Sequence, residues 1–160
     1  MAKTTFQGVV RSFGGVSKNS TTIPGVMTQS VVFAADPTAT SSTAVRVGTS
    51  ASTGKTLVLP AGAVPISVMT IGGAALATGG ATIDIGGTTA TGGIDDDGLF
   101  NEVNAQTQGT LKGADGALVL GAGLATNTTV YAKTGAVTAS GGTFVGVITY
   151  AMTDDGSESN

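Results

Sequence analysis

The chain has 160 residues, of which seven are basic and ten acidic, and it contains no histidine and no cysteine. This composition excludes histidine and thiolate catalysis, disulfide bonds and sulfur-ligated metal sites. Residues 1–60 hold five basic residues and one acidic residue, whereas residues 61–160 hold two basic and nine acidic residues. Because the basic residues are dispersed and lack interleaved aromatic side chains, we expect the basic half to contact an acidic protein surface and not a nucleic acid.

Residues 1–42 are predicted to form an extended N-terminal arm. Thr4–Val10 and Met27–Ala35 each favour a short strand, and the segment between them shows no apolar periodicity. Asp36–Ser42 has the composition of a turn or linker, so the predicted boundary lies there. The alternative interpretation is an ordinary N-terminal strand pair that belongs to the same domain.

Residues 43–152 are predicted to form an all-β domain, either a β-sandwich or a jelly roll. Short segments rich in Val, Ile and Thr alternate with Gly-rich turns, which is typical of these folds. One helical turn is predicted within Asp97–Gln106, because Leu99, Phe100 and Val103 have helical spacing. Residues 153–160 are predicted to be a flexible acidic tail. The predicted strands are Ala44–Val47, Thr56–Leu59, Pro65–Ile71, Ala81–Ile85, Ala117–Leu120, Thr128–Thr134 and Thr143–Ala151.

Two of these strands show which side chains face the core. Ile83 and Ile85 are predicted to share one face, with Asp84 on the opposite face toward solvent. The last strand has two apolar faces, which predicts a central position between two layers. Its faces are Phe144, Gly146, Ile148 and Tyr150 on one side, and Val145, Val147 and Thr149 on the other.

Three short motifs suggest ligand sites, and two of them fail on spacing. Gly54-Lys55-Thr56 lacks the glycine spacing of a phosphate loop and precedes a predicted strand instead of a helix. Gly121-Ala122-Gly123 lacks the third glycine of a dinucleotide fingerprint and is interpreted as a turn. Asp95-Asp96-Asp97 has the hard oxygen ligands of a Ca²⁺ or Mg²⁺ site, but these residues can equally cap the predicted helical turn. The sequence leaves that choice open.

Two parts of the sequence resemble known phage proteins. Met1–Ser12, followed by Gly14-Gly15, resembles the N-terminus of virion proteins of tailed phages from marine and freshwater environments. A second set of segments is similar to small phage proteins that decorate or cement icosahedral heads. These segments are Leu57–Ile66, Thr82–Gly86, Thr128–Ala132 and Thr143–Tyr150. Residues 86–127 have no counterpart in this resemblance.

The resemblance implies a non-enzymatic virion protein without a cofactor, made in the host cytoplasm and bound to the outer surface of the capsid. Its implied partners are the major capsid protein and itself, as a homotrimer, with no nucleic acid and no membrane. Lys3, Phe6, Arg11 and Lys18 are the candidate capsid-contact residues, and Thr5–Val10 and Met27–Phe33 are candidates for strand addition to a neighbouring sheet. The alternatives are a fibre, tail or receptor-binding module and, further, a carbohydrate-binding or hydrolytic β-sandwich.

Overall fold

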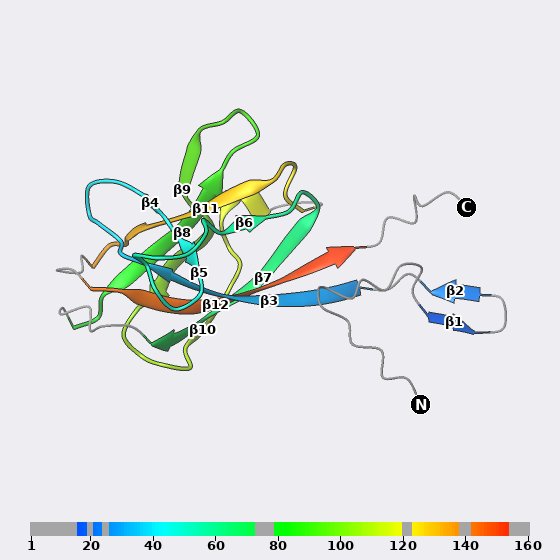
Figure 1. Cartoon of the computed structure of the whole chain (residues 1–160), viewed down its shortest axis with the longest axis horizontal. Helices are drawn as coiled ribbons and strands as arrows, with labels where there is room; N and C mark the ends of the chain where they lie inside the picture. Colours follow the sequence, from blue (N-terminus) through cyan, green and yellow to red (C-terminus); the bar gives the residue numbers. More distant parts are fainter. Residues whose placement is uncertain are drawn as a thin grey trace. The chain divides into compact units, whose positions relative to one another are not determined.

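The computed structural model describes residues 16–18, 21–23, 26–72, 79–119, 123–137 and 142–153. The described residues form twelve β-strands and one short 3-10 helix (Figure 1), so the predicted all-β class is confirmed. Contacts divide the chain into a larger unit, residues 28–152, and a smaller unit formed by residues 1–27 and 153–160.

The described part of the smaller unit includes a pair of antiparallel strands that the sequence did not predict. Strand β1 (Val16–Lys18) pairs with β2 (Thr21–Ile23), and Val16 lies opposite Ile23. The predicted strand Thr4–Val10 lies outside the described residues. So does most of the predicted acidic tail.

The larger unit contains two antiparallel sheets, as a β-sandwich requires. The first sheet has the strand order β10-β7-β12-β3-β5. Its central strand is β12. The two apolar faces of that segment predicted a central position between two layers; the strand is central within its sheet, but Val147 and Thr149 on its outer side are only half-buried. The strands are β3 (Val26–Ala35), β5 (Arg46–Val47), β7 (Ala63–Gly72), β10 (Leu111–Gly113) and β12 (Phe144–Thr153).

The second sheet has the order β4-β11-β8-β9, and β6 also pairs with β11. Most of its strands lie close to predicted segments, and β11 has the bounds that were predicted. Ile83 and Ile85 are fully buried and Asp84 is half-buried, which confirms the predicted alternation. The strands are β4 (Thr43–Ala44), β6 (Val58–Leu59), β8 (Thr82–Thr88), β9 (Ile94–Asn104) and β11 (Thr128–Thr134).

The predicted strand Ala44–Val47 is divided between the two sheets. Ala44 pairs with Tyr131 in the second sheet, whereas Arg46 pairs with Ala34 in the first. Val45 lies between them, is fully buried and donates its backbone N–H to the carbonyl of Val130. The chain therefore passes from one sheet to the other at this single core residue.

Strand β3 belongs to the sandwich, although the sequence analysis assigned residues 1–42 to an arm. It lies beside β12 in the first sheet (Figure 1), and the Tyr150 hydroxyl donates a 2.7 Å hydrogen bond to Gln29 Oε1. Phe33 is fully buried, and its ring centroid lies 5.6 Å from that of Phe144. Residues 28–42 are thus part of the larger unit, which leaves residues 1–27 as the segment for which an arm stays a prediction.

The helical turn predicted within Asp97–Gln106 is wrong, because these residues lie in and just after β9. The pairing of β8 with β9 contains two irregularities: Asp96–Leu99 lie opposite the single residue Gly86, and Asn101 and Glu102 lie opposite Asp84. Each bulge shifts the strand alternation, so that the buried residues Leu99, Phe100 and Val103 acquire helix-like spacing.

Two further differences concern the segment that follows β9. The strand predicted at Ala117–Leu120 is wrong, because Ala117–Val119 form the 3-10 helix η1, whose Val119 N–H donates to the carbonyl of Gly116. Strand β10 was not predicted, because its three residues, Leu111–Gly113, are too few to show an alternation of apolar and polar side chains.

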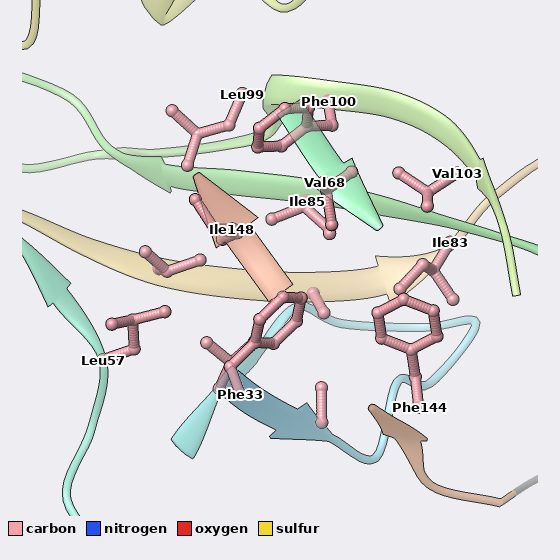
Figure 2. Packing of buried hydrophobic residues seen from close by; sticks show 14 of the residues in the cluster. Phe33, Leu57, Val68, Ile83, Ile85, Leu99, Phe100, Val103, Phe144 and Ile148 are labelled. Carbon is pink, nitrogen blue, oxygen red and sulfur yellow. The ribbon is translucent and has the colours of Figure 1, made fainter. Parts of the chain in front are cut away.

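One apolar core joins the two sheets. Figure 2 shows Phe33, Phe144 and Ile148 from the first sheet and Ile83, Ile85 and Phe100 from the second pointing into the same layer. All six side chains are fully buried. Full burial of one such side chain contributes about 1.5–3 kcal/mol, so this layer is the main source of stability.

Candidate interaction surfaces

The outer face of the second sheet is acidic. Asp84 on β8 lies directly opposite Lys133 on β11, and Asp84 Oδ1 accepts a 2.8 Å hydrogen bond from the backbone N–H of Glu102. Glu102 sits at a bulge with a left-handed φ of 53°, which a non-glycine residue adopts at a cost. Burial raises the pKa of Asp84, as do the charges of Asp97 and Glu102, while the Glu102 hydrogen bond opposes the rise.

Carboxylates at the start of the larger bulge extend this acidic face. Asp96 accepts a hydrogen bond from the Ser42 hydroxyl and forms a 3.1 Å ion pair with Lys133. The Ser42 hydrogen bond, with Lys133, lowers the pKa of Asp96. Burial raises the pKa of Asp95, and so does the hydrogen-bonded Asp97 carboxyl. We call Asp84, Asp96, Asp97 and Glu102, together with Lys133, the acidic face.

The structure changes the interpretation of Asp95–Asp97. These residues lie in strand β9, so their alternative role as caps of a helical turn is wrong. Within the described ranges, no three Asp, Glu, His or Cys side chains are grouped in a way that could hold a metal ion. Asp96 is already bound to Lys133 and Ser42.

The outer face of the first sheet is of the opposite kind over β10, β7, β12 and β3, where it lacks charge; at the β5 edge Arg46 lies opposite Ala34 on the same face. Strands β3, β7 and β12 contain no charged residue, and the one charged residue of β10 is Lys112. Lys112 is paired with the fully buried Val68, so the side chains of both residues lie on the inner face of the sheet and not on its outer face. Lys112 also forms a 2.7 Å ion pair with Asp115. The outward side chains of these four strands are therefore uncharged throughout their described residues.

An apolar row crosses this face. Leu111 lies opposite Met69, and Met69 lies opposite Val147. Hydrogen bonds between the Ser30 and Thr149 hydroxyls, 2.9 Å apart, and between Gln29 and Tyr150 set the register of β3 on β12. Continuing that antiparallel register places Val32 opposite Val147. The row Val32, Val147, Met69 and Leu111 thus spans four adjacent strands.

A parallel row of small hydroxyl side chains lies beside the apolar row. Ser67 is paired with Thr149, which is hydrogen-bonded to Ser30. The register shifts at Ile66, which makes Ile66 an additional residue of β7 at a bulge and leaves its side chain 44% exposed. Leu111 is 66% exposed. We call the two rows together with Ile66 the uncharged face.

The structure does not place the sequence-predicted contact residues on either face. Lys3, Phe6 and Arg11 lie outside the described residues, and for Lys18 only the backbone, in β1, is described. The sequence did not predict the uncharged face as an exposed surface. The alternating residues Val145, Val147 and Thr149 were the one part of the sequence that indicated an apolar outer side. That alternation was interpreted as packing beneath a second layer, whereas Val147 and Thr149 are only half-buried.

The opposed pKa shifts predict opposite effects of two Asp→Asn substitutions. The raised pKa of Asp95 means that its ionised form destabilises the fold once the pH rises above its ordinary value of 3.8. Asp95→Asn is expected to increase the free energy of unfolding at pH 7, an increase that disappears near pH 3. Thermal unfolding across this pH range measures the effect.

The matched variant is Asp115→Asn. Burial acts to raise the pKa of Asp115, but hydrogen bonds from Lys112 and from the Asn101 amide outweigh it and lower the pKa. This carboxylate stabilises the fold above its ordinary pKa, and that contribution is lost as the pH falls. Asp115→Asn should therefore reduce stability at pH 7. If both variants change the free energy of unfolding in the same direction at pH 7, the opposite pKa shifts of Asp95 and Asp115 are contradicted.

The fold and its two faces define the class of the chain as an all-β sandwich with one acidic outer sheet surface and one that is uncharged over four of its five strands. No helix within the described ranges has the length and hydropathy needed to span a bilayer. No protein-family model matches the chain, and no curated protein matches it. A solved structure described as "Cyanophage Pam1 capsid asymmetric unit" is similar to this chain, with a TM-score of 0.47 and 18% sequence identity over 93% of this chain and 94% of that one.

Proposed function

We propose that the protein is a non-enzymatic structural component of a phage virion that binds the outer surface of the capsid and reinforces or decorates it. The observation that carries this proposal is the pair of outer sheet faces, one acidic and one uncharged over four strands, on a buried two-sheet core. Surfaces of this kind suit repeated contacts over a shell, where symmetry multiplies modest interfaces. The phage-like segments at the N-terminus and in the strands support the same role.

The N-terminal segment is the proposed attachment to the capsid. Lys3, Arg11 and Lys18 are its basic residues, and Phe6 is its candidate apolar anchor. Charged contacts of this type set association rate and register more than affinity, whereas a buried aromatic side chain contributes most to affinity. The major capsid protein is the proposed partner, and the protein is expected to self-associate as a homotrimer.

A binding assay on the full-length chain tests this role. Shells assembled from a co-expressed major capsid protein of the same genome are sedimented with the protein, and the bound fraction is measured. Charge reversal at Lys3, Arg11 and Lys18 together is expected to reduce binding at least tenfold and to weaken its salt dependence. Lys55→Glu is the matched control, since Lys55 is an exposed lysine on a loop of the sandwich unit. Unchanged binding by the triple variant would contradict the proposed attachment.

Copy number separates this role from a fibre, tail or receptor-binding module. A capsid decoration protein follows the icosahedral lattice, whereas a fibre or tail protein is confined to one vertex or to the tail. Cryo-electron microscopy of native particles measures this distribution directly. Density at one vertex alone would favour the fibre or tail alternative.

A further inference from the structure

Strand β3 is covered unequally along its two edges. One edge lies beside the central strand β12 (Figure 1), whereas on the other edge the two-residue strand β5 pairs only with Phe33 and Ala34. One further hydrogen bond on that side, 2.7 Å long, runs from the Gly48 N–H to the Val32 carbonyl. Within the described residues, no strand lies beside the part of this edge that precedes Val32, and we call Val26–Val31 the open edge.

The backbone of the open edge is directed outward at alternate residues. Successive residues of a strand direct their N–H and C=O groups to opposite edges. Because the Val32 carbonyl faces β5, the N–H and C=O groups of Ser30 and Thr28 point the same way, away from β12. Those of Gln29 and Val31 point toward β12 instead. Thr28 and Ser30 are both exposed, so the open edge presents their main-chain donors and acceptors at the surface.

The other long edges have features that hinder the addition of a strand. Strand β9 contains two bulges and several carboxylates, and its Leu99 carbonyl accepts hydrogen bonds from the N–H groups of Asp115 and Gly116. Strand β7 is covered by β10 and by a hydrogen bond from the Ala114 N–H to the Ile66 carbonyl. Strand β3 contains no charged residue and no proline. Such an edge accepts an extended segment through main-chain hydrogen bonds.

The N-terminal segment of the chain supplies a strand that fits the open edge. Thr5–Val10 is a segment predicted to add to a neighbouring sheet, and it and the open edge each span six residues. Neither stretch contains a charged residue or a proline, so their pairing buries no charge and lacks no main-chain donor. Lys3 and Arg11 lie beyond the ends of Thr5–Val10 and stay available for capsid contacts. Each copy carries one such segment and one such edge, so the chain itself is sufficient to fill every edge.

We propose that Thr5–Val10 of one copy adds as a strand to the open edge of a second copy. The segment and the edge are different surfaces, so the contact is heterologous, and it forms a ring when the rotation between copies closes. A ring of three copies is the homotrimer of the proposed function, and the inference rests on that self-association. It does not require capsid binding.

Hydrogen exchange of the full-length wild type, measured for each amide by nuclear magnetic resonance, tests whether the open edge is covered. Amides bonded only to water exchange freely, whereas those in a strand ladder exchange through opening of the structure. Thr28 and Ser30 are expected to be as protected as Gln29 and Val31. An alternating pattern, in which Thr28 and Ser30 exchange at least about 100-fold faster than their neighbours, would overturn the proposal.

Proline substitutions test the identity of the added strand. Neighbouring N–H groups of a strand point to opposite edges, so Phe6→Pro combined with Gln7→Pro removes a hydrogen bond to β3 in any register. This variant is expected to lose the protection of the outward amides of the open edge, while the amides bonded to β12 stay protected. Its mass in light scattering is expected to fall from three times to once the chain mass of 15.4 kDa. Phe6→Val combined with Gln7→Thr is the matched control, because both replacements favour a strand. If the open edge stays protected in the proline variant, Thr5–Val10 is not the added strand.

Two further comparisons identify the donor of the strand and separate this contact from the proposed function. A wild-type mass of one chain with a protected open edge would overturn a second copy as the donor. Charge reversal at Lys3, Arg11 and Lys18 leaves the main chain unchanged, so that variant is expected to keep the protection and the threefold mass while its shell binding falls. A wild type that fails to bind shells but has a protected open edge and a threefold mass contradicts the proposed function and supports the strand addition.

Discussion

Deletion of residues 1–42 is expected to abolish cooperative unfolding, whereas deletion of residues 1–25 should leave a folded sandwich. The longer deletion removes β3, with the fully buried Phe33, from its place beside the central strand β12. The shorter deletion leaves β3 intact and removes only residues of the smaller unit. Thermal unfolding followed by circular dichroism distinguishes the two proteins. A cooperative transition in the longer deletion would show that β3 is dispensable.

A matched pair of substitutions tests the same boundary in the full chain. Phe33→Ala is expected to cost about 3–5 kcal/mol, because it leaves a cavity between the two sheets beside Phe144. Such a loss is a large part of the about 5–15 kcal/mol that stabilises a typical domain. Phe6→Ala, in the segment for which the arm prediction stands, should change stability by less than about 0.5 kcal/mol.

Gly86→Ala is expected to have the second-largest effect, a loss of at least about 3 kcal/mol or a failure to fold. A Cβ at Gly86 would lie 2.6 Å from the carbonyl oxygen of Asp96 and would overlap that of Asp95 more severely. Both obstacles are backbone atoms of the large β9 bulge, so no side-chain rotation can relieve them. Overpacking costs about 1–3 kcal/mol even where the surroundings are able to shift. Urea denaturation measures the loss.

Gly113→Ala is the control for this substitution. Gly113 lies in the edge strand β10, and an added Cβ would meet no atom within 4 Å. Because alanine restricts the unfolded chain, this variant is expected to be neutral or more stable by about 0.4–1 kcal/mol. Similar losses in both variants would indicate that strand glycines as such, and not the close approach of β8 to the bulge, determine stability.

Regular strands could be predicted from the sequence because their alternation is local. Thr128–Thr134 was predicted with its observed bounds, and Thr143–Ala151 was predicted as a strand close to the bounds of β12. The prediction failed for β9 because two bulges break the period of two, and the break depends on Gly86 of the partner strand. A bulge is a property of the pairing, so one segment alone cannot reveal it.

The boundary predicted at Asp36–Ser42 does not separate two units, for a related reason. Asp36–Ser42 has the composition of a linker and does connect two strands, but those strands lie in different sheets of one unit. Composition indicates where a chain turns and does not indicate whether the elements on either side share a core. Only the burial of Phe33 against Phe144 decides that.

The two outer faces were predictable only in part. The alternation of Val145, Val147 and Thr149 showed an apolar second side of β12, but Met69 and Leu111 join it through strand pairing. Likewise, Asp84 and Lys133 are 49 positions apart in the numbering and become neighbours through the β8–β11 register. Surface character that depends on register is not accessible from a single segment.

The passage of the chain through Val45 has a mechanical consequence. Ala44 is held in one sheet and Arg46 in the other, so a force that pulls the sheets apart is carried by a covalent span of three residues. The backbone at Val45 therefore ties the two sheets together, in addition to the apolar layer between them.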